Sequence, residues 1–124
     1  MLSLTRFQEN IDGLLLGKSK ESSFLLAVSG GVDSMVLAYL FQALGLKFQV
    51  AHVNYHFRGE DSNDDQKLVE DFCAKNKMVF HLYDVLEKEK KEMKSLQSWA
   101  REIRYRFFKE VREKERLDYL VTAH

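Results

Sequence analysis

The sequence contains no proline and only one cysteine, and its charges balance. The single cysteine, Cys73, excludes a disulfide within the chain and any metal or redox site that needs two of its cysteines. The 19 basic and 19 acidic residues give a formal net charge of zero, so overall charge points neither to nucleic acid nor to a membrane. No apolar run approaches the roughly 20 residues of a spanning helix, and the first residues lack a signal-peptide pattern. We therefore expect a cytoplasmic protein without membrane contact.

Apolar stretches alternate with stretches of helical period along the 124 residues, of which 45% are hydrophobic and 31% charged. This length suffices for one domain with its own core. Strands that alternate with helices predict parallel pairing, right-handed crossovers and a three-layer α/β/α sandwich, a Rossmann-like α/β fold with a parallel sheet. The expected strands lie at about residues 24–29, 48–54, 78–83 and 118–123, and the expected helices at about 4–16, 33–44, 62–76 and 96–115.

A glycine-containing hexapeptide, Ser29-Gly30-Gly31-Val32-Asp33-Ser34, joins the first expected strand to the next helix. Such a turn directs backbone N–H groups toward the space beside a helix N-terminus, where anions bind, and its glycines allow close approach to a ligand. The serine hydroxyls can add donors. Asp33 would repel a phosphate unless a cation lay between them, which suggests magnesium or a catalytic role. The alternative is a plain turn with Asp33 and Ser34 as helix-capping residues.

A second glycine-containing stretch, residues 13–19, resembles a Walker A loop. It has three residues between Gly13 and Gly17 where that loop requires four, and it follows a helical pattern in place of a strand. We therefore interpret it as the end of the first helix, with Gly17 as the C-cap.

Polar residues follow the other expected strands as well: residues 54–58, Asp84 and His124 each stand at a strand end. The carboxyl ends of parallel strands meet at one edge of a sheet, and ligands bind there, near the switch in strand order. We therefore expect these residues to share one site with residues 29–34, although they lie far apart in the sequence.

Four segments together resemble the PP-loop ATP pyrophosphatases and, among them, the family of tRNA(Ile)-lysidine synthases. Residues 29–34 match the SGGxDS signature of the superfamily. Residues 51–59, 99–108 and 120–124 resemble the HVNHxLRG and ARxxRYxFF segments of the lysidine synthases and the opening of their TAHHxDDQ segment. The resemblance spans nearly all of residues 20–124 and implies an adenine nucleotide alpha hydrolase-like fold. The acidic pair of the last segment is absent, so we expect residues 1–124 to be the N-terminal part of a PP-loop ATP-binding domain, truncated at its C-terminal end.

The resemblance also implies a chemistry. Such a ligase uses ATP and Mg²⁺ to adenylate the C2 oxygen of the wobble cytidine in the tRNA(Ile) with a CAU anticodon, which releases pyrophosphate. L-lysine then attacks C2 through an amine and expels AMP, which leaves lysidine. We expect the 124 residues alone to be inactive. The oligomeric state stays open, with a homodimer as a candidate.

In that chemistry the backbone N–H groups of residues 30–34 would hold the pyrophosphate, and Asp33 would hold magnesium or order the reacting groups. An arginine would bind the α-phosphate bidentately, as a lysine cannot. Arg101 and Arg104 are the candidates. Arg104 is preferred because it lies nearest the apolar boundary of its helix and matches the arginine of the family's RY pair; the alternative is that both are solvated surface. One helical stripe borders the buried face: Gln97, Arg101, Arg104, Phe108 and Arg112.

Residues 51–59 supply two further candidates for ATP binding. His52 stands in a strand end whose backbone groups could read adenine, or it is a histidine satisfied in the core. Arg58, in the following loop, could contact a phosphate or RNA. The segment departs from the family at Tyr55, where histidine is usual, and His56 follows it, so either His52 or His56 could have the family's role.

Other functions remain open. A tRNA thiolase is the nearest alternative within the superfamily, but many thiolases use cysteine pairs and this chain has one cysteine. An ATP-dependent amide-forming synthetase comes next. A non-catalytic nucleotide-binding module of the same shape would have little need of the Asp33 carboxylate beside phosphates. Eleven basic residues stand against six acidic ones between Lys88 and Arg116, a local excess that could meet tRNA phosphates.

Overall fold

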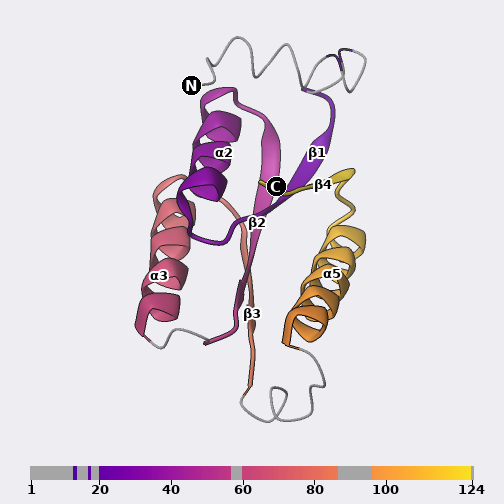
Figure 1. Cartoon of the computed structure of the whole chain (residues 1–124). Helices are drawn as coiled ribbons and strands as arrows, with labels where there is room; N and C mark the ends of the chain where they lie inside the picture. Colours follow the sequence, from indigo (N-terminus) through magenta and orange to yellow (C-terminus); the bar gives the residue numbers. More distant parts are fainter. Residues whose placement is uncertain (1–12, 14–16, 18–19, 57–59, 87–95, 124) are drawn as a thin grey trace.

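The computed structural model describes residues 20–56, 60–86 and 96–123, together with Gly13 and Gly17. The helix expected at about residues 4–16 lies outside the described residues, as do Arg58 and His124. The described elements follow the order that the sequence predicts, a strand and a helix in alternation (Figure 1).

Four strands form one parallel sheet in the order β3-β2-β1-β4, which confirms the expected α/β fold. The apolar runs form these strands because both faces of the sheet are covered. Their bounds are β1 Ser23–Ala27, β2 Lys47–Asn54, β3 Phe80–Asp84 and β4 Tyr119–Val121. The expected last strand, at about residues 118–123, is thus shorter in the structure.

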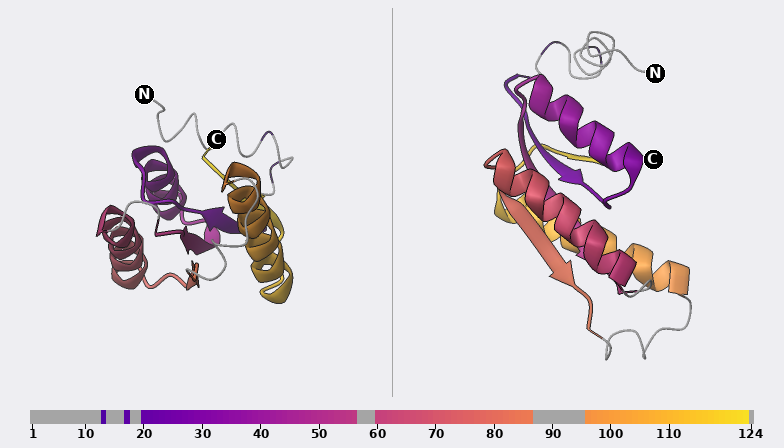
Figure 2. Two further views of the ribbon diagram at one scale, coloured as in Figure 1. Left: turned by 60° about the horizontal axis from the view of Figure 1, so that its bottom comes forward. Right: turned by 90° about the vertical axis from the view of Figure 1, so that its left-hand side faces the viewer.

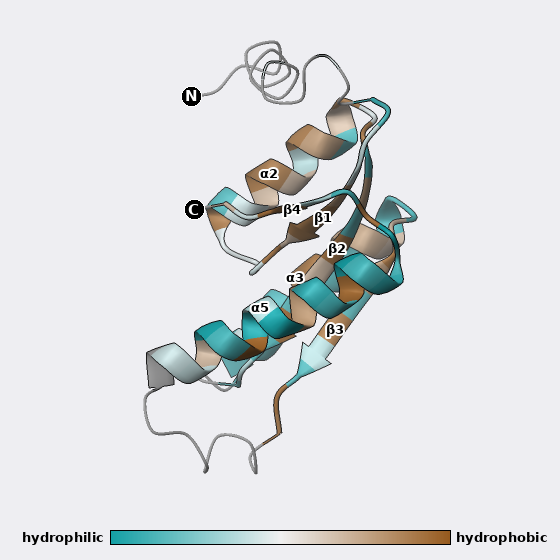
Figure 3. Ribbon diagram, turned by 90° about the vertical axis from the view of Figure 1, so that its right-hand side faces the viewer, coloured by the Kyte–Doolittle hydropathy of each residue, from teal (hydrophilic) through white to brown (hydrophobic). Residues whose placement is uncertain are grey.

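Three described helices cover the sheet: α2 Val32–Ala43, α3 Glu60–Lys75 and α5 Leu96–Lys114. Helices α2 and α3 lie on one face and α5 on the other, as the left view of Figure 2 shows. The layers are therefore those of the three-layer sandwich that the sequence predicts. The outer side of α5 is largely hydrophilic, whereas β1 and β2 are largely hydrophobic (Figure 3). Among the described helices, none is long and apolar enough to cross a membrane.

The strand residues alternate between two cores because successive side chains of a strand point to opposite faces. Leu26 and Val50 are fully buried against α2 and α3, whereas Leu25 and Ala51 pack with Phe108 of α5. This alternation decides which side chains near a strand end face α3 and which face α5.

The order of the strands places a switch point beside β1. From β1 the chain moves through β2 to the edge strand β3, and it then returns to the other side of β1 to form β4. Connections leave β1 and β3 toward opposite faces, and ligands of open parallel sheets bind where the connections diverge in this way. The hexapeptide that follows β1 lies at this point.

Candidate functional site

A cavity of about 350 Å³ opens at the carboxyl ends of β1, β2 and β4, between the loop after β1 and helix α5. It brings together residues from all four segments that the sequence singles out. Its lining comprises Ala27, Val28, Ser29, Gly31, Val32, Asp33, Ser34, Val53, Tyr55, Arg104, Tyr105, Phe108, Thr122 and Ala123.

The loop after β1 is held by its two serines. The Ser34 hydroxyl donates to the Gly31 carbonyl at 3.0 Å and accepts from the Ser29 backbone N–H at 3.1 Å. The two hydroxyl oxygens lie 3.1 Å apart, and the Gly31 N–H donates to Ser29 Oγ at 3.2 Å. Ser34 is buried. The hydroxyls that the sequence offers as ligand donors thus bond within the loop, where they fix its shape.

Backbone donors and one carboxylate face the cavity from this loop. Helix α2 begins at Val32, and the first N–H groups of a helix have no intrahelical acceptor. Gly31, the N-cap residue, makes no capping bond through a side chain. Asp33 lies in the first turn, is exposed and lines the cavity. The arrangement can therefore hold an anion on N–H groups while a carboxylate stands beside it.

Gly30 lets this loop lie directly against α3. Its φ angle is +91°, in the region that favours glycine. A Cβ at this position would lie 2.8 Å from Asp65 Cβ and 3.1 Å from the Asp65 backbone. Both conformation and space therefore require glycine at position 30.

The two candidate arginines of helix α5 line different spaces. Arg104 is half-buried and lines the cavity opposite the loop. Arg101 is exposed and lines a separate shallow hollow on the outer side of the helix. Phe108, placed by the sequence on the stripe that borders the buried face, is buried and forms part of the cavity wall. The geometry thus places Arg104, and not Arg101, in the lining of the cavity.

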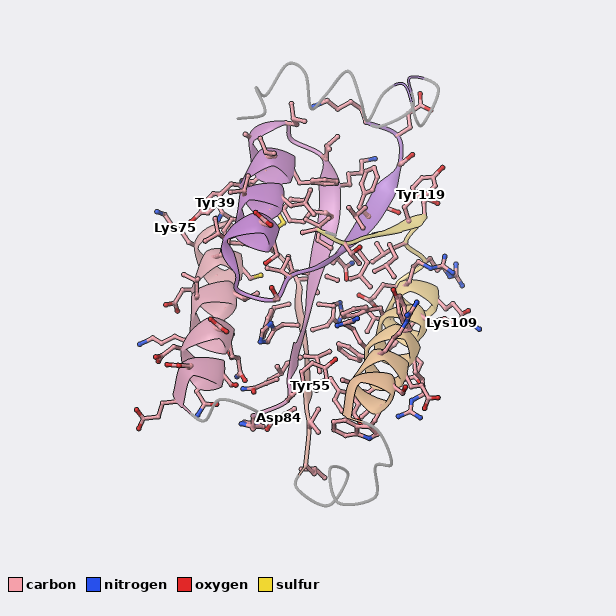
Figure 4. All side chains as sticks on the ribbon, viewed as in Figure 1. Tyr39, Tyr55, Lys75, Asp84, Lys109 and Tyr119 are labelled. Atoms are coloured by element: carbon pink, nitrogen blue, oxygen red, sulfur yellow. The ribbon has the colours of Figure 1, made fainter. Side chains whose placement is uncertain are left out.

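Tyr55 also lines the cavity. In the sequence it stands out only because the family usually has histidine at this position. It follows β2, on the side of the sheet toward α5 (Figure 4). Its hydroxyl donates to the Ala100 carbonyl of α5 at 2.9 Å. Burial raises the pKa of Tyr55, and the nearby positive charge of Arg104 opposes the rise. The contact ties the end of β2 to the helix that carries Arg104. Its signal in the sequence is an aromatic residue directly after a buried strand.

The side chain of His52 lies on the α3 face of the sheet and is not part of the lining of this cavity. It is 3% exposed, and its Nδ1 donates to the Val28 carbonyl at 2.7 Å. It lines a second cavity of about 230 Å³ with Ser62 and Asp65 of α3. In the described part of the chain, its buried Nε2 has no hydrogen-bond partner. Its neighbour Val53 lines both cavities.

The polar residues after β2 and β3 bond mainly to one another. Asn54 is 1% exposed and donates to Asn63 at 3.1 Å and to Gln66 at 2.8 Å, while its oxygen accepts from the His56 N–H at 2.9 Å. The His56 imidazole pairs with Asp84. These contacts brace the start of α3 and the ends of β2 and β3, so these two strand ends have a structural part in the site.

The cavity offers few metal ligands, and the cysteine is far from reactive. No group of three or more His, Cys, Asp or Glu side chains that could hold a metal occurs among the described residues. Cys73 is buried in the core between the sheet and α3, and burial raises its pKa to about 11. Because the thiolate is the reactive form, Cys73 is a packing residue.

Burial of His52 predicts a loss of stability in acid. Burial lowers the pKa of this imidazole below 6.5, so it stays neutral in the fold while the unfolded chain takes up a proton. The unfolded state then binds more protons, and the free energy of unfolding falls as the pH drops below about 6.5, with a slope of at most about 1.4 kcal/mol per pH unit from one group. Denaturant titrations between pH 5 and 8 measure this slope.

His52→Gln should flatten that pH dependence. His81, whose pKa burial also lowers, supplies a comparison through His81→Gln. Since His52 is the more deeply buried of the two, its variant should lose the larger part of the slope. Equal slopes in the wild type and His52→Gln would contradict this account.

The comparisons with known proteins agree with this fold. A family model described as the PP-loop domain matches residues 3–124. The NH3-dependent NAD synthetase from Campylobacter jejuni shares the fold, with a TM-score of 0.65 and 17% sequence identity over 96% of this chain and 56% of that chain.

Three curated relatives are named tRNA(Ile)-lysidine synthase. The protein of Mesoplasma florum is 45% identical over 103 residues, 82% of this chain and 26% of that protein. The protein of Ureaplasma parvum is 40% identical over 113 residues (89% and 33%), and that of Porphyromonas gingivalis W83 is 32% identical over 126 residues (99% and 28%). The chain thus spans between a quarter and a third of the length of these relatives. Since the family model extends over almost all of its residues, this chain belongs to the PP-loop domain family.

Proposed function

We propose that this chain forms the ATP-binding part of a tRNA(Ile)-lysidine synthase. The observation that carries the proposal is the cavity that joins the loop of residues 29–34 to Arg104 of α5 at the switch point of the sheet. The names of the curated relatives support the choice of substrate. The substrates would be ATP, the tRNA(Ile) with a CAU anticodon and L-lysine.

The proposed reaction has two steps. The C2 oxygen of the wobble cytidine attacks the α-phosphorus of ATP, and the bond from that phosphorus to the bridging oxygen breaks, so pyrophosphate leaves. An amine of lysine then attacks C2, the bond from C2 to the adenylate oxygen breaks, and AMP leaves. Both steps move negative charge onto phosphate oxygens, so the site must stabilise that charge.

The loop would hold the departing pyrophosphate on the N–H groups of Gly30 and of the first turn of α2. The glycines keep side chains out of the path, and the helix N-terminus favours the negative charge. Asp33 offers one carboxylate, which fits Mg²⁺, because this ion usually takes one or two carboxylates and completes its shell with water and phosphate oxygens. When bound, magnesium would neutralise charge on the leaving pyrophosphate.

Arg104 would bind the α-phosphate from the opposite wall. Its guanidinium is half-buried, so its charge is less screened than that of a fully exposed arginine, and its planar fork suits two oxygens of one phosphate. Tyr55 borders this position through its bond to Ala100. The nucleophile would enter between the loop and α5.

A tRNA thiolase is disfavoured by Cys73. Sulfur transfer through a protein cysteine needs an accessible thiol with thiolate character. Cys73 is buried in the core and its pKa is about 11, so it cannot serve. An amide-forming synthetase or a plain nucleotide-binding module would use the same loop, and the dependence of pyrophosphate exchange on tRNA separates them from the proposed enzyme.

The test is ATP–pyrophosphate exchange in the protein at its natural length, with magnesium and without lysine. We expect labelled pyrophosphate to enter ATP only when the tRNA with the CAU anticodon is present. A transcript with a GAU anticodon serves as the control, since its wobble base is guanosine. If folded protein binds ATP but gives no exchange with the CAU transcript, adenylation of this tRNA is excluded.

A further inference from the structure

Tyr105 lies between the site cavity and a shallow hollow on the outer side of α5. Its side chain is 45% exposed, and it lines both spaces. The outer hollow is otherwise lined by polar and charged residues: Ser98, Arg101, Glu102 and Arg106. The ring thus forms part of the rim over which a ligand would pass from the surface into the cavity.

Two guanidinium groups lie near this ring. Arg101 Cζ lies 5.5 Å from the ring centroid and Arg104 Cζ lies 5.7 Å from it, both within the range of a cation–π contact. A single exposed aromatic residue is ordinary on a protein surface. Tyr105 differs because the cavity stands on one side of it and exposed Arg101 and Arg106 on the other.

An exposed aromatic ring with cationic neighbours has the chemistry that binds an unpaired RNA base. Proteins hold splayed bases by stacking them on aromatic rings or guanidinium planes, while arginines meet the adjoining phosphates. A free nucleotide needs no cationic surface outside its cavity, whereas an RNA strand that continues past the reacting base does. The exposed Arg101 and Arg106 therefore favour RNA as the occupant of the outer hollow.

The proposed reaction itself requires such a platform. An enzyme that modifies a base takes it out of the stack and presents it to the reacting group. Here the reacting group is the α-phosphate, which we assign to Arg104, and Tyr105 is the next residue of the same helix. A base stacked on Tyr105 would therefore lie beside the α-phosphate.

We propose that Tyr105 is the stacking platform for the wobble cytidine, and that Arg101 and Arg106 meet the phosphates next to it. This inference rests on the proposed function and adds a residue that selects and positions the RNA substrate. The ring acts through its flat face, so phenylalanine can replace it, whereas leucine fills similar space without a π-system.

The test measures binding of the CAU-anticodon tRNA(Ile) by the protein at its natural length, at one fixed salt concentration. Tyr105→Leu should raise the Kd for this tRNA by about 5- to 150-fold, the range for loss of one base–aromatic stack. Tyr105→Phe should stay within about threefold of the wild type. The matched control is Tyr39→Leu, since Tyr39 is also an exposed tyrosine on a helix (57%) but lies on α2, on the far face of the sheet (Figure 4).

A second transcript, without the wobble base but with an intact backbone, makes the test specific. The wild type should bind this abasic tRNA more weakly by the same factor, and Tyr105→Leu should then add almost nothing. If Tyr105→Leu weakens binding of the abasic tRNA as much as it weakens binding of the intact tRNA, the ring does not stack on the wobble base and the proposal is wrong. A raised Kd for ATP measured without tRNA, with no change for tRNA, would also overturn it and assign the ring to the nucleotide. Exchange by the wild type is measured separately, so failure of the proposed function is distinguishable from failure of the platform.

Discussion

Replacement of Arg104 by alanine is expected to slow tRNA-dependent ATP–pyrophosphate exchange by about 10²- to 10⁴-fold. Arg104 is the half-buried cation that lines the cavity opposite the loop of residues 29–34. The charge on the α-phosphate is spread over more oxygens in the transition state than in ATP, so the loss falls mainly on the rate and less on the affinity for ATP. Exchange rates and ATP titrations on the same preparation separate the two.

Two further variants test whether the exchange rate depends on the planar shape of the Arg104 guanidinium or only on a positive charge on α5. Arg104→Lys keeps a cation but loses the planar fork, so it should recover only a small part of the rate. Lys109→Ala removes an exposed cation from the outer side of the same helix (Figure 4) and should leave exchange within about twofold. Exchange by Arg104→Ala near the wild-type rate would remove Arg104 from the catalytic site.

The places of Asp33 and Arg104 in the cavity lining could be foreseen from the sequence because each residue sits in a local pattern. An apolar run, a glycine pair and a helical period specify a strand, a turn and a helix without help from the rest of the chain. The structure places the turn where this pattern predicts it, between β1 and α2. Helical spacing likewise puts Arg104 near the apolar boundary of α5, and that boundary forms the cavity wall.

The contribution of Tyr55 and the direction of His52 depend on pairing between distant segments, which local patterns do not contain. Residues 52 and 53 of one strand face opposite sides of the sheet. Which of them faces α5 follows from the register of β2 against β1, where Leu26 lies opposite Val50. The tie from Tyr55 to Ala100 joins residues 45 positions apart, so only the fold reveals it.

The burial of Phe108 shows a similar limit within one helix. The helical wheel groups it with arginines on a stripe beside the buried face, yet it is 3% exposed and packs with Leu25 and Ala51. The width of a buried face depends on what the helix packs against, and a flat sheet covers a wider stripe than another helix would. A helical wheel therefore predicts which way the apolar face of α5 points, but it does not predict where the buried face ends.

Gly30→Ala should lower both stability and activity, because two separate constraints hold glycine at this position. Alanine at a φ of +91° is strained, and its Cβ would lie 2.8 Å from Asp65 Cβ. Strain and overpacking each cost about 1–3 kcal/mol, so the free energy of unfolding should fall by about 2–6 kcal/mol. The loop can relieve the contact only by moving away from α3, so exchange should fall at least about 100-fold even where the protein stays folded. Denaturant unfolding and exchange at low temperature measure the two effects.

Gly31→Ala is the matched comparison. Gly31 has a φ of −73°, which alanine adopts freely, and its added Cβ would meet only the Ser29 hydroxyl, at 3.3 Å. Its stability should therefore change by less than about 1 kcal/mol. The double variant Gly30→Ala with Asp65→Gly removes the nearest contact but not the strained φ, so it should recover part of the lost stability relative to the two single variants. If the two losses simply add, contact with α3 does not hold the loop in place, and the position of the loop of residues 29–34 must depend on its serine hydrogen bonds alone.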